Sequence, residues 1–269
     1  MSGGADRESS VRRDRADRMT GTAVVVEARK TFGSRVVLTT TAALVAGIAI
    51  LAGALTAAGR GGNERVLDRL GPLAERTGWD LLLGVVAQIT APAALLGFGV
   101  VLSWMFGREF ADRTVGALFA LPVRRTALAA AKILVFLGWG AAVATALAAL
   151  LLAAGLMIGL GSPDQGVLAA LARQHLLALL SALLATPAAW VATLGRGPLP
   201  GIGATLGLIV AAQVVVVAGA GGWFPVAAPA LWAIEPASVT PVQLALVTTV
   251  PLICAPATLL SWRRLQLDR

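Results

Sequence analysis

Six long apolar runs limit this chain more than any other feature. They contain no charged side chain and cover residues 36–58, 81–106, 133–160, 176–194, 202–219 and 242–262. A helix of about 17–25 apolar residues crosses the roughly 30 Å hydrocarbon core of a bilayer, and each run has that length or slightly more. A single segment in lipid satisfies its backbone polar groups only as a helix. The sequence therefore predicts an all-α polytopic membrane protein, with one six-helix transmembrane domain over residues 21–269.

The charged residues support this class. Only 13% of the residues are charged, whereas soluble domains carry about 25%. The net charge of +8 comes from basic residues at the edges of the apolar runs, where they face lipid headgroups. No nucleic-acid-reading motif accompanies them. We therefore expect contact with membrane lipids and no binding of nucleic acid.

The distribution of Lys and Arg predicts the orientation. If the six runs are spans, seventeen of the 22 Lys and Arg residues fall on one side of the membrane. Cytoplasmic loops carry the excess of basic residues. Both termini, and the segment between the second and third spans, are therefore expected in the cytoplasm. Usage rich in Ala, Arg and Gly is typical of a GC-rich bacterium, which indicates a bacterial plasma membrane.

The chain before the first span divides into two parts. Residues 1–20 are polar with mixed charge, which predicts a disordered tail. The stretch TAVVVEARKTFGSR that follows is short and amphipathic.

Charge and turn residues gather again in GREFADRTVGALFALPVRR, residues 107–125. Drawn as one helix over 109–121, this segment has a polar face with Glu109, Asp112, Arg113 and Gly116. Glu109 and Arg113 have the i, i+4 spacing of an ion pair, and Pro122 would end the helix. Two interpretations remain open: a helix that fits a groove on another protein, or a solvated connector.

The same segment resembles the cytoplasmic segment of type-2 ABC transporter permeases. In that family an acidic residue, a glycine, Leu-Pro, an arginine and a later lysine follow one another between the second and third spans. The matching positions here are Glu109, Gly116, Leu121, Pro122, Arg124 and Lys132. The stretch VVVEARKTFGSR is similar to the elbow helix of the family, with Glu27, Arg29 and Lys30 in register.

The resemblance implies a mechanism. Family permeases work as homo- or heterodimers with two copies of an ABC ATPase, and the segment after the second span is a coupling helix seated on that ATPase. This chain lacks the G-x-x-x-x-G-K-[ST] loop that cradles nucleotide phosphates. We therefore expect no enzyme activity and no cofactor on this chain, with ATP and Mg²⁺ on the partner. The implied coupling interface comprises Glu109, Asp112, Arg113, Gly116, Pro122, Arg124, Arg125 and Lys132.

Two glutamines and one proline-rich stretch are further candidates. Gln88 and Gln213 lie inside apolar runs, where an amide either bonds a neighbouring helix or contacts a substrate. Residues 221–241 are apolar and interrupted by proline. They are either an interfacial aromatic belt or a re-entrant outer gate that includes Trp223, Trp232 and Glu235.

The predicted function is the membrane-spanning permease subunit of an ATP-driven exporter, with cargo such as a drug, an antibiotic or a lipid. Two alternatives are a membrane anchor that recruits a cytoplasmic partner without transport, and an ion-coupled carrier. The carrier would need a buried carboxylate within a span, and the apolar runs contain none. A lone His175 and a lone Cys254 predict no metal site.

Overall fold

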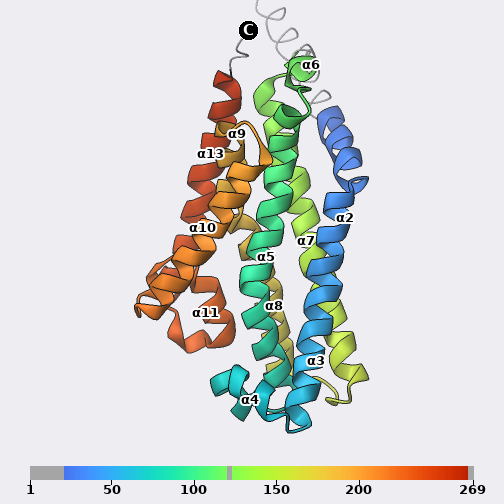
Figure 1. Cartoon of the computed structure of the whole chain (residues 1–269), viewed down its shortest axis with the longest axis vertical. Helices are drawn as coiled ribbons and strands as arrows, with labels where there is room; N and C mark the ends of the chain where they lie inside the picture. Colours follow the sequence, from blue (N-terminus) through green and yellow to red (C-terminus); the bar gives the residue numbers. More distant parts are fainter. Residues whose placement is uncertain (1–20, 120–122, 266–269) are drawn as a thin grey trace, which may run out of the picture.

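The computed structural model describes residues 21–119 and 123–265, and every regular element in these residues is a helix (Figure 1). One end of the bundle carries α6 and the last described residues of α13, and the other end carries α4. We call these the proximal and distal ends. The expected disorder of residues 1–20 and the role of Pro122 concern positions outside the described residues.

Six helical spans are long and apolar enough to cross a membrane, which confirms the predicted all-α polytopic fold. The first combines α2 (Arg35–Ala42), a short π-helix (Ala43–Gly47) and α3 (Ile48–Arg60). The others are α5 (Gly78–Ala111), α7 (Arg125–Met157), α8 with α9 (Gln165–Leu184, Thr186–Leu194), α10 (Pro198–Val217), and α12 with a 3-10 turn and α13 (Pro241–Ala245, Leu246–Thr248, Thr249–Arg264).

Shorter helices connect the spans. Residues 21–32 form an N-terminal helix before the first span. At the distal end, α4 (Glu64–Leu70) and a 3-10 turn (Gly71–Glu75) precede α5. At the proximal end, α6 (Val115–Phe119) follows α5. Between α10 and α12 lie α11 (Ala228–Ile234) and two 3-10 turns (Gly221–Trp223, Pro236–Ser238).

The fourth span is longer than its apolar run at 176–194 predicts, because α8 begins at Gln165. Asp164 caps the start: its carboxylate accepts a hydrogen bond from the backbone N–H of Val167 at 2.8 Å. Gln174 lies in the added turns and is buried. Its amide donates to Thr90 Oγ1 at 2.7 Å, so the helix continues through a polar stretch without leaving that amide unpaired.

The helices differ strongly in how much of their surface the bundle covers. α5 is central and packs against α3, α7, α8, α9, α10 and α11. Of its most apolar stretch 56% is buried, whereas the figure is 11% for α10 and 11% for the last span, Pro241–Arg264. Two apolar spans therefore present most of their surface to lipid or to another chain.

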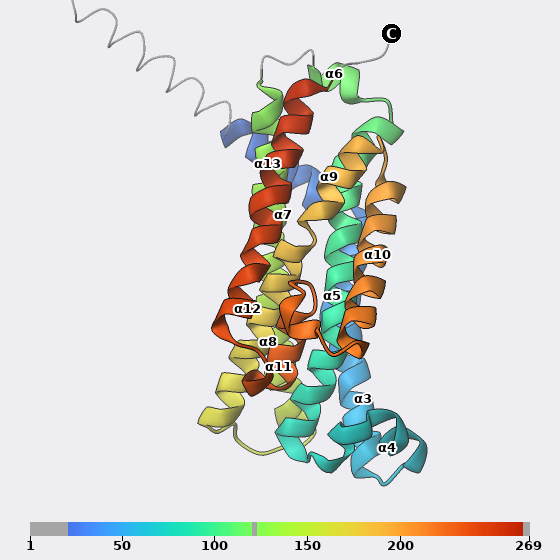
Figure 2. The same cartoon turned by 90° about the vertical axis from the view of Figure 1, so that its left-hand side faces the viewer.

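α5 and α10 approach most closely through glycine. A Cβ atom at Gly107 would lie 2.3 Å from the backbone nitrogen of Pro198, and one at Gly99 would lie 2.4 Å from Thr205 Oγ1. Both contacts are in the proximal half of α5. Further toward the distal end, α11 packs against α5 and α8, part-way along the bundle and short of the level of α4 (Figure 2).

Candidate functional site

The segment after the second span is not the continuous helix over 109–121 that the sequence pattern indicates. α5 continues to Ala111, and Arg113 adopts the left-handed backbone conformation (φ 56°). The N–H of Thr114 bonds the carbonyl of Glu109 at 3.0 Å, and the N–H of Arg113 bonds that of Phe110 at 3.1 Å. This pair of bonds is a Schellman motif, which ends helices. The helix therefore stops one turn after Glu109 and a separate short helix, α6, follows.

Glu109 belongs to a buried group of charges at the proximal end of the spans. Lys132 Nζ lies 2.8 Å from Glu27 Oε2 and 3.0 Å from Glu109 Oε1. Lys30 Nζ lies 3.2 Å from Glu27 Oε1 and 3.7 Å from Glu109 Oε1. Arg108 Nε lies 3.6 Å from Glu109 Oε1. We call these five residues the proximal charge cluster.

The centre of the cluster is sealed from solvent. Lys132 is 0% exposed, Glu27 is 2% and Glu109 is 4%. Lys30 and Arg108 lie at its edge, with side chains 36% and 17% exposed, and the Arg108 guanidinium stacks 4.3 Å above the ring of Trp104. Removing one partner from a buried ion pair leaves an uncompensated charge and destabilises strongly. The three central residues therefore hold their helices in one fixed arrangement.

The cluster joins elements that are far apart in the sequence. Glu27 comes from the N-terminal helix, Glu109 from the last turns of α5, and Lys132 from the third turn of α7. Thr114 Oγ1 donates to Glu109 Oε2 at 2.9 Å, which attaches the turn before α6 to the same carboxylate. This hydrogen bond and the ion pairs of Lys132 connect the turn to α5, α7 and the N-terminal helix.

The residues predicted for the coupling interface separate into two sets. Glu109 and Lys132 are buried and bind each other, so the expected pairing of Glu109 with Arg113 is wrong. Arg125 donates to the backbone carbonyl of Leu265, at the end of α13. Exposed positions form the second set, which we call the exposed tip: Asp112, Arg113, Gly116 and Arg124.

The elbow residues divide in the same way. Glu27 and Lys30 enter the cluster, while Arg29 faces away from it and is exposed. Arg108 and Thr114 are not among the residues that the sequence pattern predicts for this site. The sequence does contain one signal for the cluster as a whole. The only two lysines of the chain, Lys30 and Lys132, both lie in segments that also contain a glutamate near a span.

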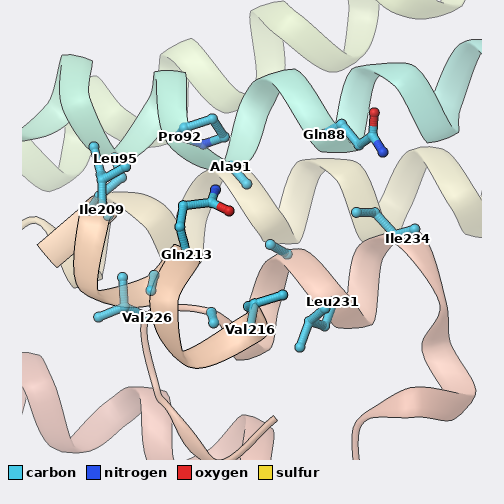
Figure 3. A pocket seen from close by; sticks show the side chains of 13 residues that line it. Gln88, Ala91, Pro92, Leu95, Ile209, Gln213, Val216, Val226, Leu231 and Ile234 are labelled. Carbon is cyan, nitrogen blue, oxygen red and sulfur yellow. The ribbon is translucent and has the colours of Figure 1, made fainter. Parts of the chain in front are cut away.

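A second candidate region lies in the distal half, where Gln88 and Gln213 line one cavity of about 440 Å³ (Figure 3). α11 forms its third wall through Ala230, Leu231 and Ile234. The proposed outer-gate residues lie around this wall. Trp232 is partly buried in α11, and Glu235 ends that helix and is exposed. Trp223 is 65% exposed.

Comparison with known proteins identifies the family. A family model described as ABC-2 family transporter protein matches residues 26–212, which include residues 26–32 of the N-terminal helix, the proximal charge cluster and most of α10. The chain belongs to the ABC-2 transporter family. It is an ABC-2 type permease, a multi-pass membrane protein of a family whose members generally work with an ABC ATPase. No curated protein and no solved structure matches the chain.

Proposed function

We propose that this ABC-2 permease is the membrane subunit of an ATP-driven exporter in a bacterial plasma membrane, with its proximal end in the cytoplasm. Hydrolysis takes place on a separate ATPase chain, which binds ATP and Mg²⁺. Two permease chains, identical or paralogous, work with two ATPase copies. The excess of Lys and Arg at the proximal end favours this orientation. The absence of a phosphate-binding loop from the sequence favours a separate motor.

The burial of Lys132 between Glu27 and Glu109 is the observation that carries the proposal. In this scheme the ATPase contacts the exposed tip and displaces it during its cycle. Thr114 passes the displacement to Glu109 through its 2.9 Å hydrogen bond. Lys132 passes it on to α7 and to the N-terminal helix. Glu109 thus acts as a positioning residue behind the contact surface, and not on that surface.

The exposed tip supplies opposite charges at neighbouring positions, Asp112 and Arg113, which suits a polar groove on a partner. Gly116 has no atom within 4 Å of the position where a Cβ would lie, so another backbone can approach it closely. Membrane anchors that recruit a soluble protein would also expose such a surface. The identity of the protein bound therefore separates the two functions.

Charge reversal at the exposed tip tests the proposal. In the variant Asp112→Arg/Arg113→Asp, we expect loss of most ATPase co-purification and of ATP hydrolysis stimulated by the permease. Each of the two side chains would then carry the same charge as the partner group that it faces and would be repelled. Pull-down from the native membrane, followed by hydrolysis assays on the complex, measures both quantities.

The chain offers a matched control at its other end. Asp68 and Arg69 in α4 are also adjacent, opposite in charge and exposed. The variant Asp68→Arg/Arg69→Asp should retain the ATPase. Equal retention by both variants would contradict docking at the exposed tip, and recovery of a kinase or a protease in place of an ATPase would support the anchor.

A further inference from the structure

α5 and α10 pack directly against each other in the proximal half of the bundle and are separated by a cavity in the distal half. In the proximal half, Gly99 and Gly107 allow the two helices to touch. In the distal half the helices are separated by the cavity, with Leu95 and Ile209 at its inner end and Gln88 and Ile234 toward the distal end (Figure 3). The cavity therefore lies in the distal half of the bundle.

Polar side chains lie in the middle of this cavity, at Gln213, and in its distal part, at Gln88. In Figure 3 the side chain of Gln213 extends from α10 toward α5, and Gln88 lies on α5 nearer the distal end; both side chains are exposed in the isolated chain. Within the part of the chain that the structure describes, neither amide is bonded by another residue. Pro92 also lines the cavity and has no N–H to donate to the carbonyl of Gln88 one turn earlier. The site therefore offers both donors and acceptors without a partner.

The remaining surface of the cavity is apolar and carries no charge. All the lining residues other than the two glutamines are Ala, Pro, Leu, Ile or Val. Two charged side chains are placed at the rim: Glu235, which follows Ile234, and Arg76, which donates to the carbonyl of Ile234 at 3.4 Å. Their charges are opposite. Burying a charged group in such a cavity would be costly, whereas an uncharged group that hydrogen-bonds would be accepted.

We infer that this cavity binds an uncharged amphiphile, with its hydrogen-bonding head at Gln88 and Gln213 and its apolar body against Leu95 and Ile209. The volume of about 440 Å³ is within the usual range for small-molecule sites. Gln213 lies distal to Ile209 and Gln88 lies distal to Leu95 (Figure 3), which matches a lipid-like molecule in the distal leaflet with its head toward the distal end. Only the role of this occupant as exported cargo rests on the proposed function.

Three photoreactive probes with the same alkyl chain test the charge preference: an alkyl glucoside, an alkyl sulfate and an alkyl trimethylammonium. The full chain is purified into lipid nanodiscs and irradiated with each probe, and labelled peptides are identified by mass spectrometry. The glucoside should label residues 88–95 and 209–216 at least about tenfold more than either charged probe, because only it avoids burying a charge. Equal labelling by the three probes would overturn the inference.

Two variants and one control localise the site. Ala212→Trp fills the cavity from α10, and Gln88→Leu/Gln213→Leu removes both amides at similar volume. Both should abolish most of the glucoside labelling. Val214→Trp places the same large side chain on a part of α10 that is 61% exposed and outside the cavity, and it should retain the labelling. Unchanged labelling in the double leucine variant would overturn the assignment of the head group, even if Ala212→Trp fails to fold.

Failure of this inference and failure of the proposed function give different results. Cavity labelling in a chain that recovers no ATPase would leave the site standing and remove the export function. ATPase recovery with labelling that the cavity variants do not change would leave the export function and overturn the site.

Discussion

Lys132 is the residue whose surroundings explain most about the proximal end. An isolated buried ammonium group would lose several kcal/mol of hydration, but two carboxylates lie within 3.0 Å of this one. Each glutamate in turn depends on Lys132, since the other cations are farther away or only partly buried. The three side chains therefore form one unit, and loss of Lys132 leaves both glutamates without their nearest counter-charge.

Neutralising Lys132 should lower stability by about 3–5 kcal/mol, because Lys132→Met leaves two buried carboxylates close together without their main counter-charge. Thermal unfolding of the purified permease in detergent measures this loss. Lys30→Met is the control. It removes a lysine from the same cluster, but one whose side chain is 36% exposed, so the expected change is about 0–1 kcal/mol. Equal unfolding temperatures for the two variants would show that burial of Lys132 contributes nothing.

At the scale of elements, the contact between α5 and α10 depends on glycine. Gly107 is buried, and the backbone nitrogen of Pro198 occupies the space that a side chain would need. Interhelical contacts of this kind are typical of membrane proteins, where small residues let backbones approach closely. The direct packing at Gly99 and Gly107 therefore determines where the cavity between the two helices begins.

Gly107→Ala should destabilise the permease by roughly 1–3 kcal/mol, since the added methyl forces α5 and α10 apart. Gly203→Ala on α10 is the matched control. Nothing lies within 4 Å of a Cβ at that position, and Ala replaces Gly in a helix with a gain of up to about 1 kcal/mol. Comparison of the two unfolding temperatures checks the prediction. A neutral Gly107→Ala variant would mean that the helices are not in close contact there.

The sequence predicts the spans well and the contacts between them poorly. Hydropathy is a local property, so six apolar runs suffice to place six helices. The Lys132–Glu27 pair spans 105 positions, and no local pattern indicates which glutamate a lysine will meet. The turn at Arg113 was missed for a different reason. The left-handed residue that follows the end of a helix is usually glycine. An arginine at this position instead fits the pattern of a charged helix face, so the sequence does not indicate a helix end there.

At the scale of the whole molecule, the chain has one end rich in charge and two spans with little cover. The buried part of the most apolar stretch is 11% for α10 and 11% for the last span, Pro241–Arg264. An ABC-2 permease that pairs with a second permease has such surfaces available for the contact. The exposed tip lies at the opposite end from α4 (Figure 1), so the two ends face different compartments in a membrane-spanning arrangement.

Labelling of single cysteines by a membrane-impermeant maleimide measures the orientation of the chain, on which the proposed docking of a cytoplasmic ATPase at the exposed tip depends. The background variant is Cys254→Ser, which removes the single native cysteine, and the two test positions are Asp112→Cys and Asp68→Cys. In intact cells we expect reaction at position 68 and none at position 112, with position 112 reacting only once the membrane is opened. Reaction at position 112 in intact cells, with position 68 protected, would show the opposite orientation and contradict docking of a cytoplasmic ATPase at the exposed tip.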